Sequence, residues 1–308
     1  MLRLVTQLME SRAESAVPSL AITNLCIAKD EAVIVNVTDH NKYLYHYTSA
    51  ATAINCILKF RTLRFGEYRR TNDPKESKNW LFDFVSFEPK VDRIDYDRNA
   101  MSAWLSDELK RDTRLICFSR DTGPLSGNHL ADIFNRGFCK PRMWAQYAEK
   151  HTGVCLVFNR ESLEKEITTQ LPAHTPLLGG EVQYKDCGIA RDLFEELTFS
   201  INTDDLEKHG RDRYPAIHLR KHHQQLFFEK MSDWEAENEY RYVAFTNSSE
   251  PLDVKYGSAL VGMVFGEDTS EENKREMSLL TSGTGVDMRG LKWKNHSPWY
   301  DFERQGYR

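Results

Sequence analysis

The sequence lacks most features of secreted, membrane-spanning and nucleic-acid-binding proteins. Six cysteines are scattered over 308 residues without a Cys-x-x-Cys pair, which indicates buried thiols of a reduced, cytoplasmic protein rather than disulfides or a zinc site. No run approaches the roughly 18 apolar residues of a membrane span. The N-terminus lacks the apolar segment of a secretory signal. A net charge of -5 argues against non-specific nucleic-acid binding.

Familiar catalytic motifs are missing as well. The chain contains neither a Walker-type glycine-rich loop nor a Gly-x-Ser-x-Gly elbow, so it gives no sign of the usual phosphate-binding loop or of an α/β-hydrolase. Internal repeats and low-complexity tracts are absent too. Any chemistry must therefore come from side chains that the fold brings together.

Short strands mixed irregularly with helices predict the α+β class rather than a doubly wound parallel sheet. Alternation and aromatic content predict strands at Tyr43–Thr48 and Tyr240–Phe245, and a continuous apolar run predicts another at Gly153–Phe158. Helical spacing of apolar residues predicts a helix over Ala50–Phe60, and the pattern also indicates a short helix over Met143–Glu149.

We expect one main domain. Residues 1–40 are weakly patterned and are predicted to form an N-terminal extension, while residues 41–308 form a single α+β domain. A long polar helical pattern at Leu206–Lys230 indicates a helical insertion around residues 160–230.

The first candidate site residue is His46, at the end of the strand Tyr43–Thr48. Alternation places Leu44, His46 and Thr48 on one face. Polar side chains at a strand end that precedes a helix suit the hydroxyl or phosphate groups of a ligand. The alternative is a hydrogen-bonded core histidine, with Thr48 helping to cap the helix.

An acidic segment before Tyr240 is the second candidate. Glu235, Glu237 and Glu239 recur at every second residue, so a strand would place three carboxylates on one face. Their repulsion costs stability unless a cation such as Arg241 or a ligand compensates, and such clusters are tolerated mainly in active sites. The alternative is a solvated edge carrying a Glu239–Arg241 pair.

Two further segments each have a structural and a functional interpretation. Asp73, Pro74 and Glu76 fit the first positions of a helix. That capping pattern leaves the preceding Asn72 unexplained. The functional alternative is a loop beside a cleft, in which Asn72 or Asp73 contacts a ligand. The segment Met143–Phe158 places two aromatic side chains three residues apart on one helical face; they suit either the core or a flat ligand ring.

Read in order, these segments resemble a large bacterial family known as domain of unknown function 2971, some members of which are described as abortive-infection, phage-resistance proteins. The resemblance covers about residues 43–300. The motifs that carry it are YHYTS at Tyr45–Ser49, LRFGE at Leu63–Glu67, NDPKE at Asn72–Glu76, ICFS at Ile116–Ser119, MWAQYAEKHTGVCLVF at Met143–Phe158 and WEAENEYR at Trp234–Arg241.

A second resemblance, to the ADP-ribosyltransferase superfamily, is carried by the strand histidine His46 and the late Glu-x-Glu at Glu237 and Glu239. It implies a split antiparallel sheet with surrounding helices and NAD as substrate without a metal. It implies Glu239, Glu237 and His46 as catalytic residues. The residues expected to bind NAD are His46, Thr48, Tyr68, Asn72, Trp144, Tyr147 and Arg241, with Tyr68 and Tyr147 the candidates for stacking on nicotinamide.

The expected reaction is therefore ADP-ribosyl transfer or NAD hydrolysis by a cytoplasmic toxin-type effector of phage defence. Its acceptor would be a protein or nucleic acid, a defence-system partner or antitoxin would restrain it, and no membrane is involved. One alternative is a metal-dependent nuclease that uses Asp73, Glu76 and Glu237 or Glu239, because clustered carboxylates bind Mg²⁺. Another is a non-catalytic sensor or interaction module.

Overall fold

The computed structural model describes residues 34, 36–89, 95–173, 175–186, 197–246, 248, 250–295 and 297–300. Most of the predicted N-terminal extension lies outside this range, and the division at residue 40 stays a prediction. Within the described part, Ile34 and Val37 pack into a hydrophobic core of the main domain. None of the helices described here has both the length and the apolar character needed to cross a bilayer.

Strands and helices alternate irregularly, which confirms the α+β class. The strands are β1 (Tyr43–Thr48), β2 (Thr62–Glu67), β3 (Asp83–Val85), β4 (Thr113–Arg120), β5 (Val154–Asn159), β6 (Leu177–Glu181), β7 (Gln183–Tyr184), β8 (Ser200–Asn202), β9 (Glu229–Lys230), β10 (Glu239–Phe245), β11 (Leu252–Lys255), β12 (Leu260–Phe265), β13 (Asp287–Lys294) and β14 (Ser297–Tyr300).

The α-helices are α2 (Ala50–Thr52), α3 (Pro74–Ser77), α4 (Arg98–Lys110), α5 (Pro141–Tyr147), α6 (Arg160–Gln170), α7 (Thr203–His209), α8 (Tyr214–Phe227) and α9 (Glu271–Leu280). A π-helix over Ala53–Leu58 continues α2. Short 3-10 helices span Tyr68–Arg70, Ile133–Asn135, Leu197–Phe199 and Ser232–Glu237.

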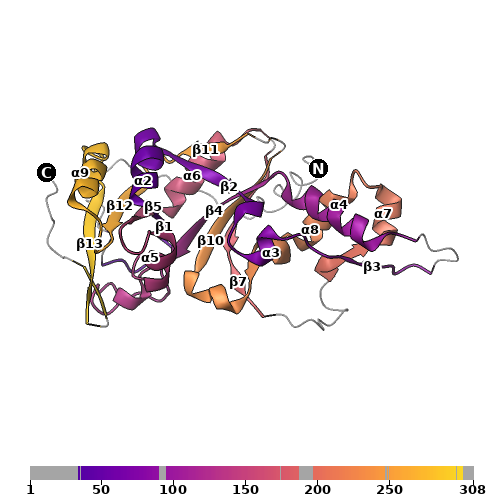
Figure 1. The fold of residues 1–308 in the computed structure, drawn as a ribbon, viewed down its shortest axis with the longest axis horizontal. Coiled ribbons are helices and arrows are strands. Elements are labelled where there is room, and N and C mark those ends of the chain that lie inside the picture. The colour runs from indigo at the N-terminus through magenta and orange to yellow at the C-terminus, as the bar shows by residue number, and fades with distance from the viewer. Residues whose placement is uncertain are drawn as a thin grey trace, which may run out of the picture.

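One mixed sheet of ten strands forms the centre of the described structure. Its main path runs β11-β2-β4-β1-β5-β12-β13-β14; β10 branches from β4, and β6 pairs with β10. The pairings within it are antiparallel except for the parallel pair of β12 and β13. Figure 1 shows α2 and α6 on one side of this sheet, α5 on the other, and α4, α7 and α8 gathered at one end of the molecule.

The sheet divides at β4, and this division leaves an opening between β1 and β2. Strand β10 pairs with the whole of β4 along one edge. The other edge is shared, because β2 pairs with Arg114 and Leu115 while β1 pairs with Ser119 and Arg120. The short stretch of β4 between these two pairings, centred on Cys117, has no strand partner on that edge. The sheet is therefore open between β1 and β2.

Three hydrophobic clusters hold this arrangement. One lies between the sheet and α2, α6 and α9, and includes Leu44, Phe118 and Tyr242. A second joins α4 and α8 to the far end of β4 and β10. The third packs α5 and the loop after β4 against the opposite face of β1 and β5. Burial of aromatic and branched side chains on both faces supplies most of the driving force for the fold.

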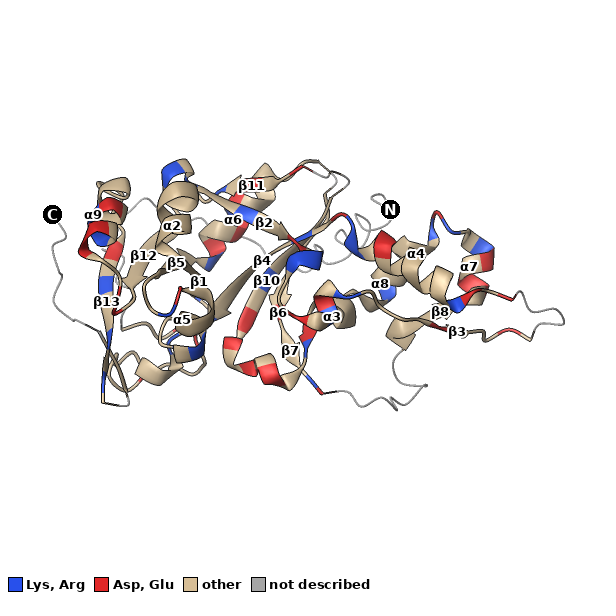
Figure 2. Cartoon of the chain, viewed as in Figure 1, with Lys and Arg blue, Asp and Glu red and all other residues tan. Residues whose placement is uncertain are grey.

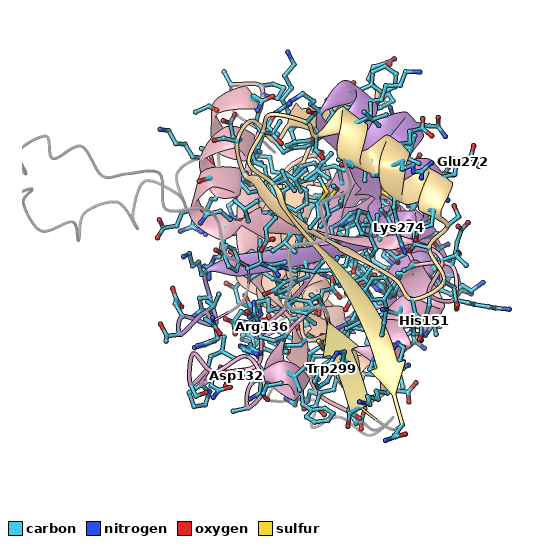
Figure 3. All side chains as sticks on the ribbon, turned by 90° about the vertical axis from the view of Figure 1, so that its left-hand side faces the viewer. Asp132, Arg136, His151, Glu272, Lys274 and Trp299 are labelled. Carbon is cyan, nitrogen blue, oxygen red and sulfur yellow. The ribbon has the colours of Figure 1, made fainter. Side chains whose placement is uncertain are left out.

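A buried polar network fixes the loop after β4 beneath β1. The Arg136 Nε donates to Asp121 Oδ1 at 3.0 Å, and the Tyr45 hydroxyl donates to Asp121 Oδ2 at 2.7 Å. Arg136 (labelled in Figure 3) also donates to the Ile34 carbonyl, and its side chain is buried. The charges of Arg136 and Asp121 are paired with each other, so the network holds the loop in one position without the cost of an unpaired buried charge.

The helix predicted over Leu206–Lys230 differs from the observed structure. The pattern there predicts one long helix, but α7 ends at His209 and α8 begins at Tyr214. The residue after α7 is Gly210, whose φ of 73° lies in the left-handed region. Glycine adopts that conformation without the steric cost of a Cβ. Around residues 160–230 the chain also contributes strand β6, which pairs with β10, so this region is more than a helical insertion.

Candidate functional site

A cavity of 470 Å³ opens where the sheet divides. Its walls come from β1, β2, β4 and β10, from α5, and from the segments around residues 70–76 and 230–237. His46, Asn72, Tyr147, Glu237 and Glu239 all contribute to the lining. Five of the nine predicted site residues are thus brought to one place, and the volume lies in the range of small-ligand sites.

His46 reaches this cavity because the sheet is open beside it. Its Nδ1 lies 3.1 Å from the Cys117 carbonyl oxygen, in the stretch of β4 that has no strand partner on that edge. A carbonyl only accepts, so Nδ1 carries the proton and Nε2 presents a lone pair. Burial lowers the pKa of His46 despite the opposing effect of the Cys117 carbonyl. The imidazole is therefore a neutral acceptor in the cavity wall at physiological pH.

The acidic residues approach from the other face of the sheet. Ser119 pairs with Tyr45 on one side and with Glu239 on the other, so these three side chains share a face and His46 belongs to the opposite one. The strands β1 and β10 are not neighbours, since β4 lies between them. The gap in the sheet is what allows His46 and Glu239 to line the same cavity.

The expectation that Glu235, Glu237 and Glu239 share one strand face is wrong. Residues Ser232–Glu237 form a 3-10 helix, and the strand begins only at Glu239. Asn238 between them is left-handed, with φ of 43°, a conformation that asparagine tolerates better than most residues. Its side-chain amide donates to the carbonyls of Arg120 and Asp121, which fixes this turn. The turn buries Glu237 and Glu239 and leaves Glu235 exposed.

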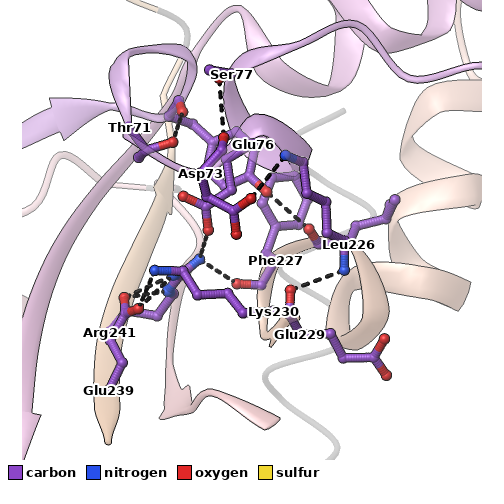
Figure 4. A network of polar contacts seen from close by, with 12 residues as sticks. Thr71, Asp73, Glu76, Ser77, Leu226, Phe227, Glu229, Lys230, Glu239 and Arg241 are labelled. Atoms are coloured by element: carbon purple, nitrogen blue, oxygen red, sulfur yellow. Dashed lines mark hydrogen bonds and ion pairs between the residues drawn. The ribbon is translucent and has the colours of Figure 1, made fainter. Parts of the chain in front are cut away.

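Two cations neutralise the buried carboxylates (Figure 4). Arg241 donates to both oxygens of Glu239, from Nε at 2.7 Å and from Nη2 at 2.8 Å. Its Nη1 donates to Glu76 Oε1 at 2.6 Å. Lys230 Nζ lies 2.8 Å from Glu239 Oε2 and 2.9 Å from Glu237 Oε2. Figure 2 shows the concentration of acidic residues where β10 begins.

The two glutamates differ in how many of their acceptor positions are used. A carboxylate has about four lone-pair positions. Glu239 accepts two bonds from Arg241 and one from Lys230, and the Cys117 side chain adds another. Glu237 accepts one from Lys230 and one from the Tyr147 hydroxyl, at 2.6 Å. Glu237 therefore keeps the greater capacity to accept a ligand hydroxyl.

Tyr147 and Trp234 belong to the aromatic residues that line the cavity, together with Tyr45, Tyr47 and Phe118. The Tyr147 hydroxyl contacts the side chain of Asn72 in addition to Glu237, and burial followed by the charge of Glu237 raises the pKa of Tyr147. Cations lie near the ring of Trp234, with Lys230 Nζ 5.2 Å and Arg142 Cζ 5.6 Å from its centroid. Within the described part of the chain, no cation lies over the ring of Tyr147 in this way, so that ring is the better surface for stacking a flat ligand ring.

Four predicted site residues lie outside the lining. Tyr68 and Trp144 are buried in two separate cores. Thr48 is also buried, at the end of β1. Arg241, which is 0% exposed, acts on the cavity only through Glu239 and Glu76. The core interpretation of Trp144 is therefore the better one, while the partner predicted for the acidic cluster, Arg241, is present.

Other residues of the site did not follow from the sequence. Lys230 gives no local signal, because its carboxylate partners are brought to it by the 3-10 turn. Trp234 begins the WEAENEYR motif, but its role depends on that same turn. Asp73 does cap α3 as predicted, accepting from the Lys75 amide at 2.8 Å. However, α3 ends at Ser77, and the same Asp73 lines the cavity.

The pairing of Glu239 predicts a specific loss of stability in acid. Burial alone would raise its pKa, but Arg241 and then Lys230 outweigh burial and hold it at about 2, below the ordinary 4.5. Because the folded-state pKa is the lower one, the stabilisation is complete above pH 4.5 and is lost as the pH falls toward 2. Urea titrations between pH 5 and 2 should show this loss in the wild type and a shallower slope in Glu239→Gln; equal slopes would contradict it.

Residues 143–242 match the model of a family described as "Protein of unknown function (DUF2971)". This confirms the resemblance to that family expected from the motifs, over the part of the chain that contains most of α5, strands β5 and β6, and the whole acidic turn Ser232–Glu239. No curated protein matches the chain. No solved structure matches it either. The family description names no reaction, so function rests on the cavity.

Proposed function

We propose that this protein binds NAD in the cavity at the division of the sheet and cleaves the bond between nicotinamide and ribose. The observation that carries the proposal is that a neutral histidine, a carboxylate pair and an aromatic ring line one cavity of ligand size. Neutral imidazole and carboxylate oxygens accept hydrogen bonds from ribose hydroxyls. An aromatic face favours the cationic nicotinamide ring.

In this reaction the bond between ribose C1′ and the ring nitrogen breaks. Its electron pair stays with the nitrogen, which leaves as neutral nicotinamide, and positive charge develops on the ribose. Glu237 is suited to face that charge, since one of its oxygens is oriented by Tyr147 and the other by Lys230. A preorganised carboxylate stabilises an oxocarbenium-like state, as in glycoside hydrolysis.

His46 is proposed to orient the ribose. Its Nε2 lone pair accepts a hydroxyl proton, because Nδ1 is committed to the Cys117 carbonyl. Fixing the ribose in this way lowers the barrier through positioning rather than through charge. Water or an acceptor group then forms the new bond at C1′ and gives its proton to Glu237, which restores neutrality at the product.

The nuclease alternative is less well supported. Of the carboxylates it needs, Glu76, Glu237 and Glu239 are already bonded to Arg241 or Lys230. Two fixed positive charges would repel Mg²⁺ from the same oxygens.

A toxin-type role in defence follows from NAD cleavage and predicts an effect in cells. Expression of the wild-type chain in a bacterial host should lower cellular NAD and slow growth, because unrestrained cleavage depletes a shared cofactor. Glu237→Gln should restore both, whereas Glu235→Gln, in an exposed residue of the same turn, should behave like the wild type. Growth curves with NAD measurements on matched protein levels provide the test. Slow growth with unchanged NAD would exclude NAD depletion as the cause.

A further inference from the structure

A buried carboxylate oxygen in the cavity wall has no partner within the protein. Asp73 is 1% exposed, and its Oδ1 accepts from the Lys75 amide at 2.8 Å. Its Oδ2 is buried and makes no hydrogen bond with any residue that the structure describes. Leaving a charged or polar atom in this state costs about 1–3 kcal/mol, so an outside donor at this position would be favourable.

Asp73 Oδ2 differs from the other buried atoms without a hydrogen-bond partner because its residue lines the cavity. Buried side-chain atoms without a partner also occur in Asn41, Arg69, Arg120, Gln225 and Tyr242 among the described residues. None of those residues lines the cavity, whereas Asp73 does. Cavity walls are where a polar group is left for a ligand to satisfy.

The surroundings of Asp73 indicate which part of a ligand it meets. Tyr147 connects the two sides of the cavity, since its hydroxyl contacts Glu237 and the side chain of Asn72. Asn72 directly precedes Asp73, and both residues line the cavity. A flat ring stacked on Tyr147 would therefore lie beside the segment that carries Asp73.

We propose that Asp73 is the specificity-determining residue for the nicotinamide group, with Oδ2 accepting a hydrogen bond from the carboxamide N–H. This rests on the proposed function and adds a substrate requirement to it. Nicotinic acid adenine dinucleotide carries a carboxylate in place of the carboxamide. That group offers no N–H and brings a second negative charge, so the site should reject it.

Asp73→Asn tests this without disturbing the helix. Asparagine is as good an N-cap as aspartate, so Oδ1 can still accept from Lys75 while Oδ2 becomes an amide donor. We expect kcat/KM for NAD to fall roughly tenfold and the preference for NAD over nicotinic acid adenine dinucleotide to shrink by roughly a hundredfold. Asp97→Asn is the matched control, because Asp97 caps α4 in the same way and does not line the cavity; its preference should be unchanged.

Asp73→Ser keeps a capping oxygen and deletes Oδ2, so it should also lose the preference even if the asparagine variant folds poorly. An unchanged preference in a folded Asp73 variant would overturn the role of Asp73 and leave NAD cleavage intact. A wild-type protein that releases nicotinamide from neither dinucleotide would overturn the proposed function and this inference together.

Discussion

Replacement of Glu237 by glutamine is expected to reduce nicotinamide release from NAD by about a hundredfold or more. The glutamine keeps an oxygen for the Tyr147 hydroxyl but removes the charge that faces the ribose. The free energy of unfolding should fall by only about 1–2 kcal/mol, because Lys230 retains Glu239 as a partner. Steady-state kinetics and urea unfolding on the same preparations separate the two effects.

The comparison with Glu239→Gln makes that result diagnostic. Glu239 holds Arg241 through two bonds and Lys230 through a third, so its neutralisation should cost about 3–5 kcal/mol. If Glu239→Gln loses activity only in proportion to the loss of folded protein, the role of Glu239 is to stabilise the fold. Glu237→Gln, in contrast, should be folded and inactive. An active, folded Glu237→Gln protein would remove Glu237 from the mechanism.

Replacement of Arg241 by methionine is expected to destabilise the fold as much as Glu239→Gln does. Arg241 is 0% exposed and bonds to Glu239, Glu76 and the Phe227 carbonyl. Its loss leaves the buried carboxylates of Glu239 and Glu76 without the cation that bonds to both of them. We expect a loss of about 3–5 kcal/mol, a large part of the roughly 5–15 kcal/mol that stabilises a typical domain. Urea or thermal unfolding measures it.

Arg64→Met is the matched control. Arg64 also makes a two-bond pair with a carboxylate, that of Asp253, but its side chain is 66% exposed. Exposed pairs contribute at most about 1 kcal/mol. Adding Glu239→Gln to Arg241→Met should destabilise less than the two single effects combined, because one substitution removes the charge that the other leaves unpaired. Strict additivity would show that the two residues are not coupled.

Local patterns were sufficient for much of the fold. The strand at Tyr43–Thr48 follows from alternation and the helix beginning at Ala50 follows from helical spacing, and both occur where predicted. The strand predicted at Tyr240–Phe245 begins one residue earlier, at Glu239. These elements depend on residues within a few positions of one another, which is the range over which periodicity carries information.

The site depends on contacts that periodicity does not contain. Glu76 and Arg241 are 165 residues apart in sequence, and neither shows which charge the other will meet. The alternation of three glutamates predicted a strand. The sequence pattern does not show that Asn238 adopts a left-handed conformation, which ends the 3-10 helix and starts the strand only at Glu239. The position of His46 at the cavity depends on the unpaired edge of β4, a property of the whole sheet rather than of one strand.

The central claim, that the cavity cleaves NAD, is tested most directly by measuring nicotinamide release. Purified wild-type protein should be incubated with labelled NAD in EDTA, alone and with a cell lysate, and the label followed in nicotinamide, ADP-ribose, protein and nucleic-acid fractions. We predict release of nicotinamide without a divalent cation, abolished by Glu237→Gln and weakened by His46→Ala. Intact NAD, together with nucleic-acid cleavage that appears only when Mg²⁺ is added, would contradict the claim.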